Sequence, residues 1–137
     1  MVAKNITIAI GNQKGGVGKT TSTACIGAAL ALRGKRVLLV DLDAQQNLTF
    51  TLTQNEDPET SIYDTLVKDQ PLPIVPIREN LDLVPASLDL ARAEIDMATM
   101  MAREGILKSC LDEQKEKYDY ILMDCSPSLG IVTTNAL

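Results

Sequence analysis

Residues 14–21 read KGGVGKTT, and this short stretch decides the fold class of the 137-residue chain. It follows a β-rich segment, Ile6–Ile10, that is bounded by Gly11, and it leads into an Ala-rich helical pattern, Lys19–Leu32. A glycine-rich loop between a strand and a helix lets backbone N–H groups surround a phosphate. The stretch therefore predicts a phosphate-binding site made of Lys14, Gly15, Gly16, Val17, Gly18, Lys19, Thr20 and Thr21.

The charged and hydroxyl residues of this loop predict its ligand. Lys19 is placed to reach the β- and γ-phosphates of a nucleotide, and Thr20 offers a hydroxyl to Mg²⁺. One position departs from the general pattern G-x-x-x-x-G-K-[ST], because Gln13 stands where the first glycine would be, and Lys14 adds a second lysine. The alternative is a glycine-rich turn with two solvated lysines, and the flanking strand and helix argue against it. We therefore expect ATP with Mg²⁺ at this loop.

Further apolar segments predict the other strands of a sheet. Val37–Val40 is a continuous apolar run of strand length, and it completes a βαβ unit with parallel strands. Leu81–Val84 and Tyr118–Met123 predict two more strands. Helical segments are expected near Asn47–Leu52, from the cap Ser61 to Val67, from about Ser87, over residues 102–117 and from Ile131 to Leu137. The chain thus reads as a single α/β domain over residues 1–137, P-loop NTPase-like, with a mainly parallel sheet flanked by helices.

Acidic residues follow the predicted strands. Asp124 comes after Tyr118–Met123, and Asp41 and Asp43 come after Val37–Val40. Ligands of nucleotide-binding α/β sheets lie at the carboxyl ends of strands. Asp124 is therefore expected to hold magnesium through its water shell, and either Asp41 or Asp43 is a candidate for ordering an attacking water. A strand-ending Asp often only forms a turn, but three of them beside a phosphate loop favour a functional site.

The composition limits the classes of function. The net charge is -5 and the basic residues are scattered, which argues against a DNA-binding surface on this chain. There is no His, and the three cysteines contain no C-x-x-C pair, which argues against His-based catalysis, zinc and disulfides. No signal peptide and no apolar run long enough to span a bilayer is visible. We therefore expect a cytoplasmic protein without a membrane segment.

Three segments resemble the ParA/Soj/MinD family of deviant Walker A ATPases. Residues 13–21 (QKGGVGKTT) are similar to the family's deviant Walker A motif. Residues 41–49 (DLDAQQNLT) resemble its D-x-D-P-Q-G-N-x-T segment, and residues 124–130 (DCSPSLG) resemble its D-x-P-P-S-L-G Walker B and switch II segment. Gln13 and the Gln-Asn pair fit ParA/Soj, the chromosome and plasmid partition ATPases, better than MinD. The departures, at Ala44, Gln46 and Ser126, spare the charged groups.

The resemblance implies a role in ATP hydrolysis for each matching residue. Lys19 would be the phosphate lysine, Thr20 would bind magnesium, and Thr21 would lie at the α-phosphate. Asp43 would position the hydrolytic water, and Asp124 would be the Walker B acid. The metal would therefore be surrounded by Thr20, Asp43 and Asp124.

The resemblance also implies partners. Lys14 would be the signature lysine that reaches across a homodimer to the partner's nucleotide, so that ATP is sandwiched between two subunits. A partition-type DNA-binding activator protein would be a further partner, and the protein would associate with the nucleoid. Non-specific DNA would be bound only through a C-terminal half that this chain lacks.

Length sets this chain apart, because members of the family run to roughly twice its size. We therefore expect either an N-terminal fragment truncated after the switch II segment or a natural short form. An exposed sheet edge beside the phosphate-loop strand is expected to produce a non-native oligomer or a strand-exchanged dimer. The alternative functions are a nucleotide-binding module without turnover, a MinD-like ATPase, or an iron–sulfur carrier, which would need paired cysteines.

Overall fold

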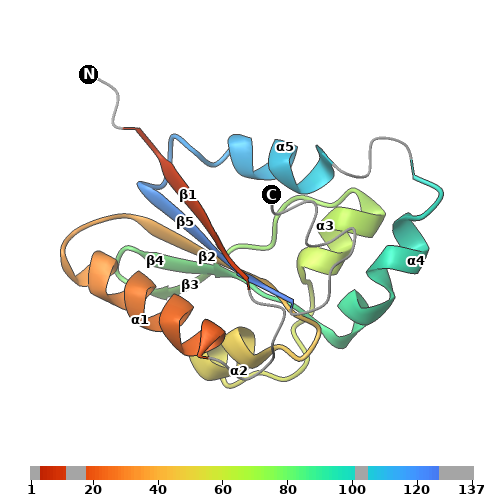
Figure 1. The fold of residues 1–137 in the computed structure, drawn as a ribbon, viewed down its shortest axis with the longest axis horizontal. Helices are drawn as coiled ribbons and strands as arrows, with labels where there is room; N and C mark the ends of the chain where they lie inside the picture. The colour runs from red at the N-terminus through yellow and green to blue at the C-terminus, as the bar shows by residue number, and fades with distance from the viewer. Residues whose placement is uncertain (1–3, 12–17, 101–104, 127–137) are drawn as a thin grey trace.

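The computed structural model describes residues 4–11, 18–100 and 105–126, which form one five-stranded sheet with helices on both faces (Figure 1). The strands are β1 (Ile6–Ile10), β2 (Val37–Leu42), β3 (Val75–Arg78), β4 (Leu81–Val84) and β5 (Tyr120–Cys125), in the spatial order β1-β5-β2-β4-β3. All neighbours pair in parallel except β3, which is antiparallel to β4. The predicted α/β class with a mainly parallel sheet is confirmed.

The alternation of side chains along β2 creates two apolar layers. Val37 and Leu39 pack in one cluster with residues of α1 and α2, whereas Leu38 and Val40 pack in the other cluster with residues of α3, α4 and α5. Figure 1 shows the same division, with α1 and α2 on one side of the sheet and the later helices on the other. The helices are α1 (Lys19–Leu32), α2 (Asn47–Thr53), α3 (Ile62–Lys68), the 3-10 helix η1 (Leu88–Arg92), α4 (Ala93–Met97) and α5 (Ile106–Asp112).

The start of α3 confirms the expected cap at Ser61. The Ser61 hydroxyl accepts a hydrogen bond from the backbone N–H of Tyr63 at 3.2 Å. The Asp64 carboxylate in turn accepts one from the Ser61 backbone N–H at 2.8 Å. This reciprocal capping box satisfies N–H groups that the first turn of the helix cannot pair internally. Helices α2 and η1 likewise begin where the sequence predicts helical segments.

Two predicted strands are longer than expected at their carboxyl ends. β2 continues to Leu42 and β5 continues to Cys125, so Asp41 and Asp124 lie inside strands rather than after them. The reason is tertiary, because β5 is an interior strand whose Asp124 is in register with Ile10 on one side and with Asp41 on the other. Ladder partners on both sides extend the strand through a residue that would end an isolated one.

The predicted helix over residues 102–117 is wrong at its C-terminal end. α5 stops at Asp112, and turns follow in which Gln114 N–H donates to Leu111 O and Lys117 N–H donates to Gln114 O. Hydrogen bonds between residues three positions apart wind the backbone more tightly than an α-helix does. They form where the chain leaves α5 and turns toward β5. Residues 102–104 and the predicted helix Ile131–Leu137 lie outside the described residues.

The short strand β3 was not predicted from the sequence. Pro71, Pro73 and Pro76 indicate extended backbone in this region but do not by themselves indicate a strand. Pro76 lies within β3, which is an edge strand of the described sheet, and its register with β4 is irregular between Pro76 and Arg78. Proline has no N–H to donate, so it is tolerated in an edge strand, where one side needs no ladder bond.

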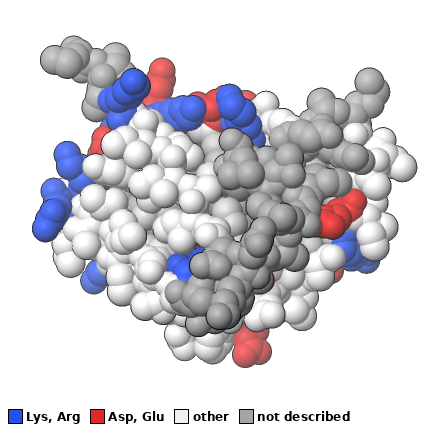
Figure 2. All heavy atoms as spheres, viewed as in Figure 1, with Lys and Arg blue, Asp and Glu red and all other residues white. Residues whose placement is uncertain are grey.

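The strand that leads into the phosphate loop, β1, is the other edge of the described sheet. Its Ile6 and Ile8 are 46% and 40% exposed, and Ile26 on the neighbouring helix α1 is 45% exposed. In the view of Figure 2, most Lys and Arg lie along the upper and left margins, and the area inside these margins is mostly uncharged. The expected exposed edge is therefore present, while the expected oligomer stays a prediction. Over the ranges that the structure describes, no helix is both long and apolar enough to cross a membrane.

Candidate nucleotide-binding site

Four of the predicted site residues meet at the carboxyl ends of β2 and β5. These strands are neighbours, and Asp41 of β2 is in register with Asp124 of β5. Asp43 follows directly after β2, and α1 begins at Lys19 beside the same strand ends. Parallel strands end at a common edge, so residues that are about 80 positions apart in sequence come together there.

Asp124 is the centre of this arrangement and is fully buried, at 0% exposure. Its Oδ1 forms an ion pair with Lys19 Nζ. Its Oδ2 accepts a hydrogen bond from Thr20 Oγ1 at 2.7 Å. Lys19 Nζ also lies 3.7 Å from Asp43 Oδ2, so one ammonium group bridges two carboxylates. The structure therefore brings together four predicted residues: Lys19, Thr20, Asp43 and Asp124.

The other predicted residues of the loop divide into two groups. Gly18 is described, and it lies at the N-cap of α1 with φ 80°, a left-handed conformation that glycine adopts at little cost. Its carbonyl accepts the first helical bond, from Ser22 N–H at 2.8 Å. Thr21 is exposed in the first turn of α1. Lys14, Gly15, Gly16 and Val17 lie outside the described residues.

The described donor set fits magnesium and a triphosphate. Thr20 Oγ1 and Asp124 Oδ2 are adjacent oxygen donors, and Mg²⁺ is usually held by one or two carboxylates together with phosphate oxygens and waters. In residues 4–11, 18–100 and 105–126, no group of three or more His, Cys, Asp or Glu is placed to hold a metal ion. That finding is compatible with a magnesium site that phosphate oxygens complete. Lys19 adds the positive charge that a phosphate requires.

Asp41 has surroundings of a different kind, made of backbone and hydroxyl donors. Its Oδ1 accepts a hydrogen bond from Asp43 N–H at 3.1 Å. Its Oδ2 accepts two from Thr49, from the backbone N–H at 2.9 Å and from Oγ1 at 2.7 Å. Thr49 Oγ1 accepts in turn from Ala86 N–H at 2.9 Å. Asp41 therefore connects the backbone of Asp43, helix α2 and the segment after β4.

This network decides between the two candidates for ordering a water. Asp41 is 0% exposed, and the donors of Asp43 and Thr49 engage both of its oxygens. Asp41 is therefore the less accessible of the two candidates, and its side chain holds the backbone of Asp43. The Asp43 side chain is 11% exposed beside Lys19 and keeps access to the site.

Burial controls the protonation of two groups at these strand ends. It raises the pKa of Asp41 to about 6, against the hydrogen bonds from Thr49 and Asp43, which lower it, and the nearby charge of Asp124 raises it further. Burial, helped by the charge of Asp124, raises the pKa of the Cys125 thiol to about 11. Cys125 is therefore a neutral thiol at physiological pH and a poor nucleophile.

The sequence reasoning missed two residues of this region. Thr49 lies in the segment that carries the family resemblance, but no role was predicted for it, because its three-way contact joins residues 37 positions apart. Gln46 adopts a left-handed φ of 58° as the N-cap of α2, and its side chain is largely buried. The sequence signal for Gln46 is that it stands where the resembling family segment has Gly.

Strand β1, helix α1 and the lysine–carboxylate cluster at the strand ends fit a P-loop nucleotide-binding class of protein. The family model of the AAA domain matches residues 5–137, and the chain belongs to this family.

The relatives of this chain include partition proteins. The sporulation initiation inhibitor protein Soj of Bacillus subtilis is 52% identical over 134 residues, which cover 95% of this chain and 53% of that protein. The chromosome-partitioning ATPase Soj of Treponema pallidum is 45% identical over 135 residues, 96% of this chain and 52% of that protein. The resemblance to the Soj/ParA partition ATPases is confirmed, and the chain spans about half the length of these relatives.

A solved structure supports the same fold. The cobyrinic acid a,c-diamide synthase from Mycobacterium smegmatis, with a bound ATP analogue and magnesium, superposes with a TM-score of 0.92 and 43% sequence identity. The match covers 97% of this chain and 56% of that one.

Proposed function

We propose that this chain is the ATP- and Mg²⁺-binding part of a ParA-type ATPase that acts in chromosome or plasmid partitioning. The observation that carries the proposal is the cluster in which Lys19 bridges Asp124 and Asp43 while Thr20 donates to Asp124. The names of the Soj relatives and the ATP analogue with magnesium in the M. smegmatis structure support it.

Each residue of the cluster has a task in this proposal. Lys19 binds the β- and γ-phosphates, and Thr20 and Asp124 hold magnesium, which supplies charge neutralisation at the phosphate oxygens when bound. Asp43 orients the attacking water, because its carboxylate reaches the site while its backbone is held by Asp41. Lys14, Gly15, Gly16, Val17, Gly18 and Thr21 complete the phosphate loop.

The partners in this proposal rest on the resemblance. Residues 1–137 form one P-loop ATPase domain, which pairs with a second copy through the nucleotide site, where Lys14 reaches the partner's nucleotide. A partition-type DNA-binding protein activates turnover, and the protein works in the cytoplasm on the nucleoid. The alternative is a nucleotide-binding module without turnover.

Calorimetry and turnover measurements on three variants test the proposal. Lys19→Ala removes the phosphate charge and is expected to weaken Mg-ATP binding at least about tenfold, the effect of losing one charged hydrogen bond. Asp43→Ala is expected to keep binding and to lose turnover. Lys35→Ala, an exposed lysine between α1 and β2, is the matched control and should change neither.

The outcomes separate the candidate functions. Turnover that survives both Lys19→Ala and Asp43→Ala would contradict the ATPase assignment. ATP binding that depends on Lys19, without turnover in the unmodified chain, would favour the nucleotide-binding module.

A further inference from the structure

The turn that carries Asp43 leaves one of its carboxylate oxygens for the site. Asp43 Oδ1 accepts a hydrogen bond from Gln45 N–H at 3.0 Å, and Asp43 O accepts one from Gln46 N–H at 2.9 Å. The Asp43 N–H donates to Asp41 Oδ1 at 3.1 Å. The remaining polar atom, Asp43 Oδ2, lies 3.7 Å from Lys19 Nζ. The position of Oδ2 therefore depends on what holds the rest of the residue.

Of these three hydrogen bonds, the one to Asp41 leads out of the turn. The two glutamines belong to the turn itself, so their bonds shape it without attaching it to the rest of the molecule. The direction of the Asp41 carboxylate is set by Thr49, whose N–H and Oγ1 donate to Asp41 Oδ2 at 2.9 Å and 2.7 Å. Thr49 Oγ1 accepts in turn from Ala86 N–H at 2.9 Å. The Thr49 hydroxyl thus links the turn of Asp43 to the segment that follows β4.

This segment, residues 85–87, is itself attached to the start of α3. Pro85 O accepts a hydrogen bond from Ile62 N–H at 2.8 Å. The hydroxyls of Ser61 and Ser87 lie 2.9 Å apart. The bond from Ala86 N–H therefore fastens helix α2 to a part of the molecule that is held on both sides of Ala86.

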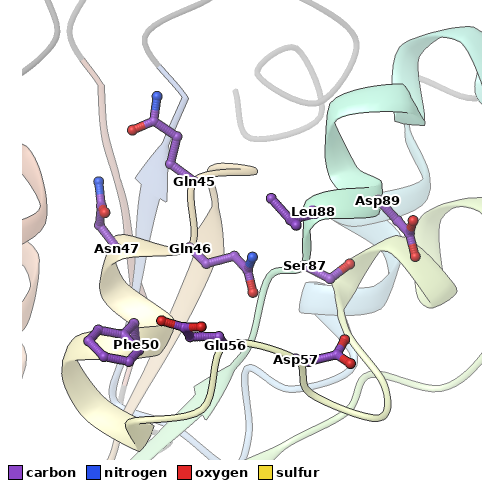
Figure 3. Close-up of a pocket in the computed structure, with 9 residues that line it drawn as sticks. All are labelled: Gln45, Gln46, Asn47, Phe50, Glu56, Asp57, Ser87, Leu88 and Asp89. Atoms are coloured by element: carbon purple, nitrogen blue, oxygen red, sulfur yellow. The ribbon is translucent and has the colours of Figure 1, made fainter.

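The surroundings of Thr49 show why this bond matters. Figure 3 shows Gln45 and Gln46 on the stretch between β2 and α2, and Ser87 across an open pocket on the segment that follows β4. Side chains that face an open pocket gain few packing contacts from the opposite wall. Thr49 is 0% exposed, and its hydrogen bonds connect the two walls behind the pocket.

We propose that Thr49 is a positioning residue for Asp43. Its hydroxyl donates to Asp41, which directs the other oxygen of that carboxylate at the Asp43 N–H and so sets the place of Asp43 Oδ2 in the site. The task of Asp43 in orienting a water rests on the proposed function. The placement of Asp43 is a property of the nucleotide-free chain and can be measured without ATP.

Amide hydrogen exchange of the nucleotide-free chain tests the placement. Thr49→Val keeps the shape and the backbone N–H of the residue and removes the hydroxyl. In this variant the Asp43 amide is expected to exchange about tenfold faster relative to the sheet amides of β2, the size of one hydrogen bond to a charged group. Thr49→Ser restores the hydroxyl and should return the Asp43 rate to that of the unmodified chain. Thr51→Val, at an exposed position of the same helix, is the matched control and should leave the rate unchanged.

The reference to β2 separates positioning from a general loss of stability. A variant that only destabilises the fold speeds the exchange of the Asp43 amide and of the β2 amides together. An unchanged ratio of these rates in Thr49→Val would therefore overturn the proposal. A Thr49→Ser variant whose Asp43 amide exchanges as fast as in Thr49→Val would also overturn it, because the hydroxyl would then not be the cause.

Steady-state turnover gives a second measurement. Thr49→Val should lower kcat about tenfold and leave KM for Mg-ATP unchanged, because the contacts of Asp124 with Lys19 and Thr20 do not run through Thr49. A raised KM with an unchanged kcat would contradict the proposal. If the unmodified chain shows no turnover, the ATPase assignment fails, and the exchange rates by themselves still decide whether Thr49 positions Asp43.

Discussion

Asp41 and Asp124 occupy matching positions on neighbouring strands, and both are fully buried, yet their partners are of opposite kinds. Asp41 accepts hydrogen bonds from the backbone of Asp43 and from Thr49, which are fixed parts of the fold. Asp124 is paired with the Lys19 ammonium and the Thr20 hydroxyl, which belong to the first turn of α1.

The two carboxylates therefore have different structural surroundings. Two of the three donors to Asp41 are backbone N–H groups, so this carboxylate links the Asp43 segment to helix α2. Both partners of Asp124 are side chains of a lysine and a threonine, which under the proposed function would bind phosphate and magnesium. Removing Asp41 should therefore reduce the stability of the fold, and removing Asp124 should mainly reduce ligand binding.

The largest expected effect is the loss of stability in Asp41→Ala. The substitution leaves the N–H groups of Asp43 and Thr49 and the Thr49 hydroxyl without their acceptor, which should lower the free energy of unfolding by roughly 4 kcal/mol. Asp124→Asn keeps a polar group of the same shape and should cost much less. Urea unfolding of the two variants measures both values, and a larger loss in Asp124→Asn would reverse the comparison.

The pH dependence of stability provides a second test. Burial raises the pKa of Asp41 from 3.8 to about 6, so the folded chain holds this proton more tightly than the unfolded chain. The part of the stability that depends on protonation of Asp41 is therefore fully present below pH 3.8 and is lost as the pH rises through about 6. Between pH 4.5 and 7.5 the unmodified chain should lose roughly 2 kcal/mol relative to Asp41→Asn, which cannot titrate. Parallel stability–pH curves for the two proteins would contradict the raised pKa.

The smallest expected effect concerns Thr49, the residue through which Asp41 reaches the segment after β4. Thr49→Val keeps the shape, removes the hydroxyl and should lower the unfolding free energy by roughly 1.5 kcal/mol, because Asp41 and Ala86 N–H each lose a partner. Thr49→Ser should recover most of that loss. Thr51→Val, at an exposed position of the same helix, is the control. Similar stability of Thr49→Val and Thr51→Val would show that the Thr49 bridge contributes little.

Local patterns were enough to predict most elements of the fold. The apolar run Val37–Val40 is buried on both faces and became β2, and Ser61 followed by Asp64 formed the expected cap. Predictions failed where partners distant in sequence decide the outcome. β5 runs through Asp124 because strands pair on both of its sides, and the residues after Asp112 leave the helix because the chain must enter β5.

The sequence by itself predicted the main groups of the nucleotide site. The order Gly-Lys-Thr after a strand, with acids after two later strands, predicts Lys19, Thr20 and Asp124 together with either Asp41 or Asp43, because parallel strands end at a common edge. The family resemblance favours Asp43. Only the tertiary structure showed that the Asp41 carboxylate is bound by Thr49 and by the backbone of Asp43, because burial and hydrogen-bond partners depend on contacts that local sequence does not specify.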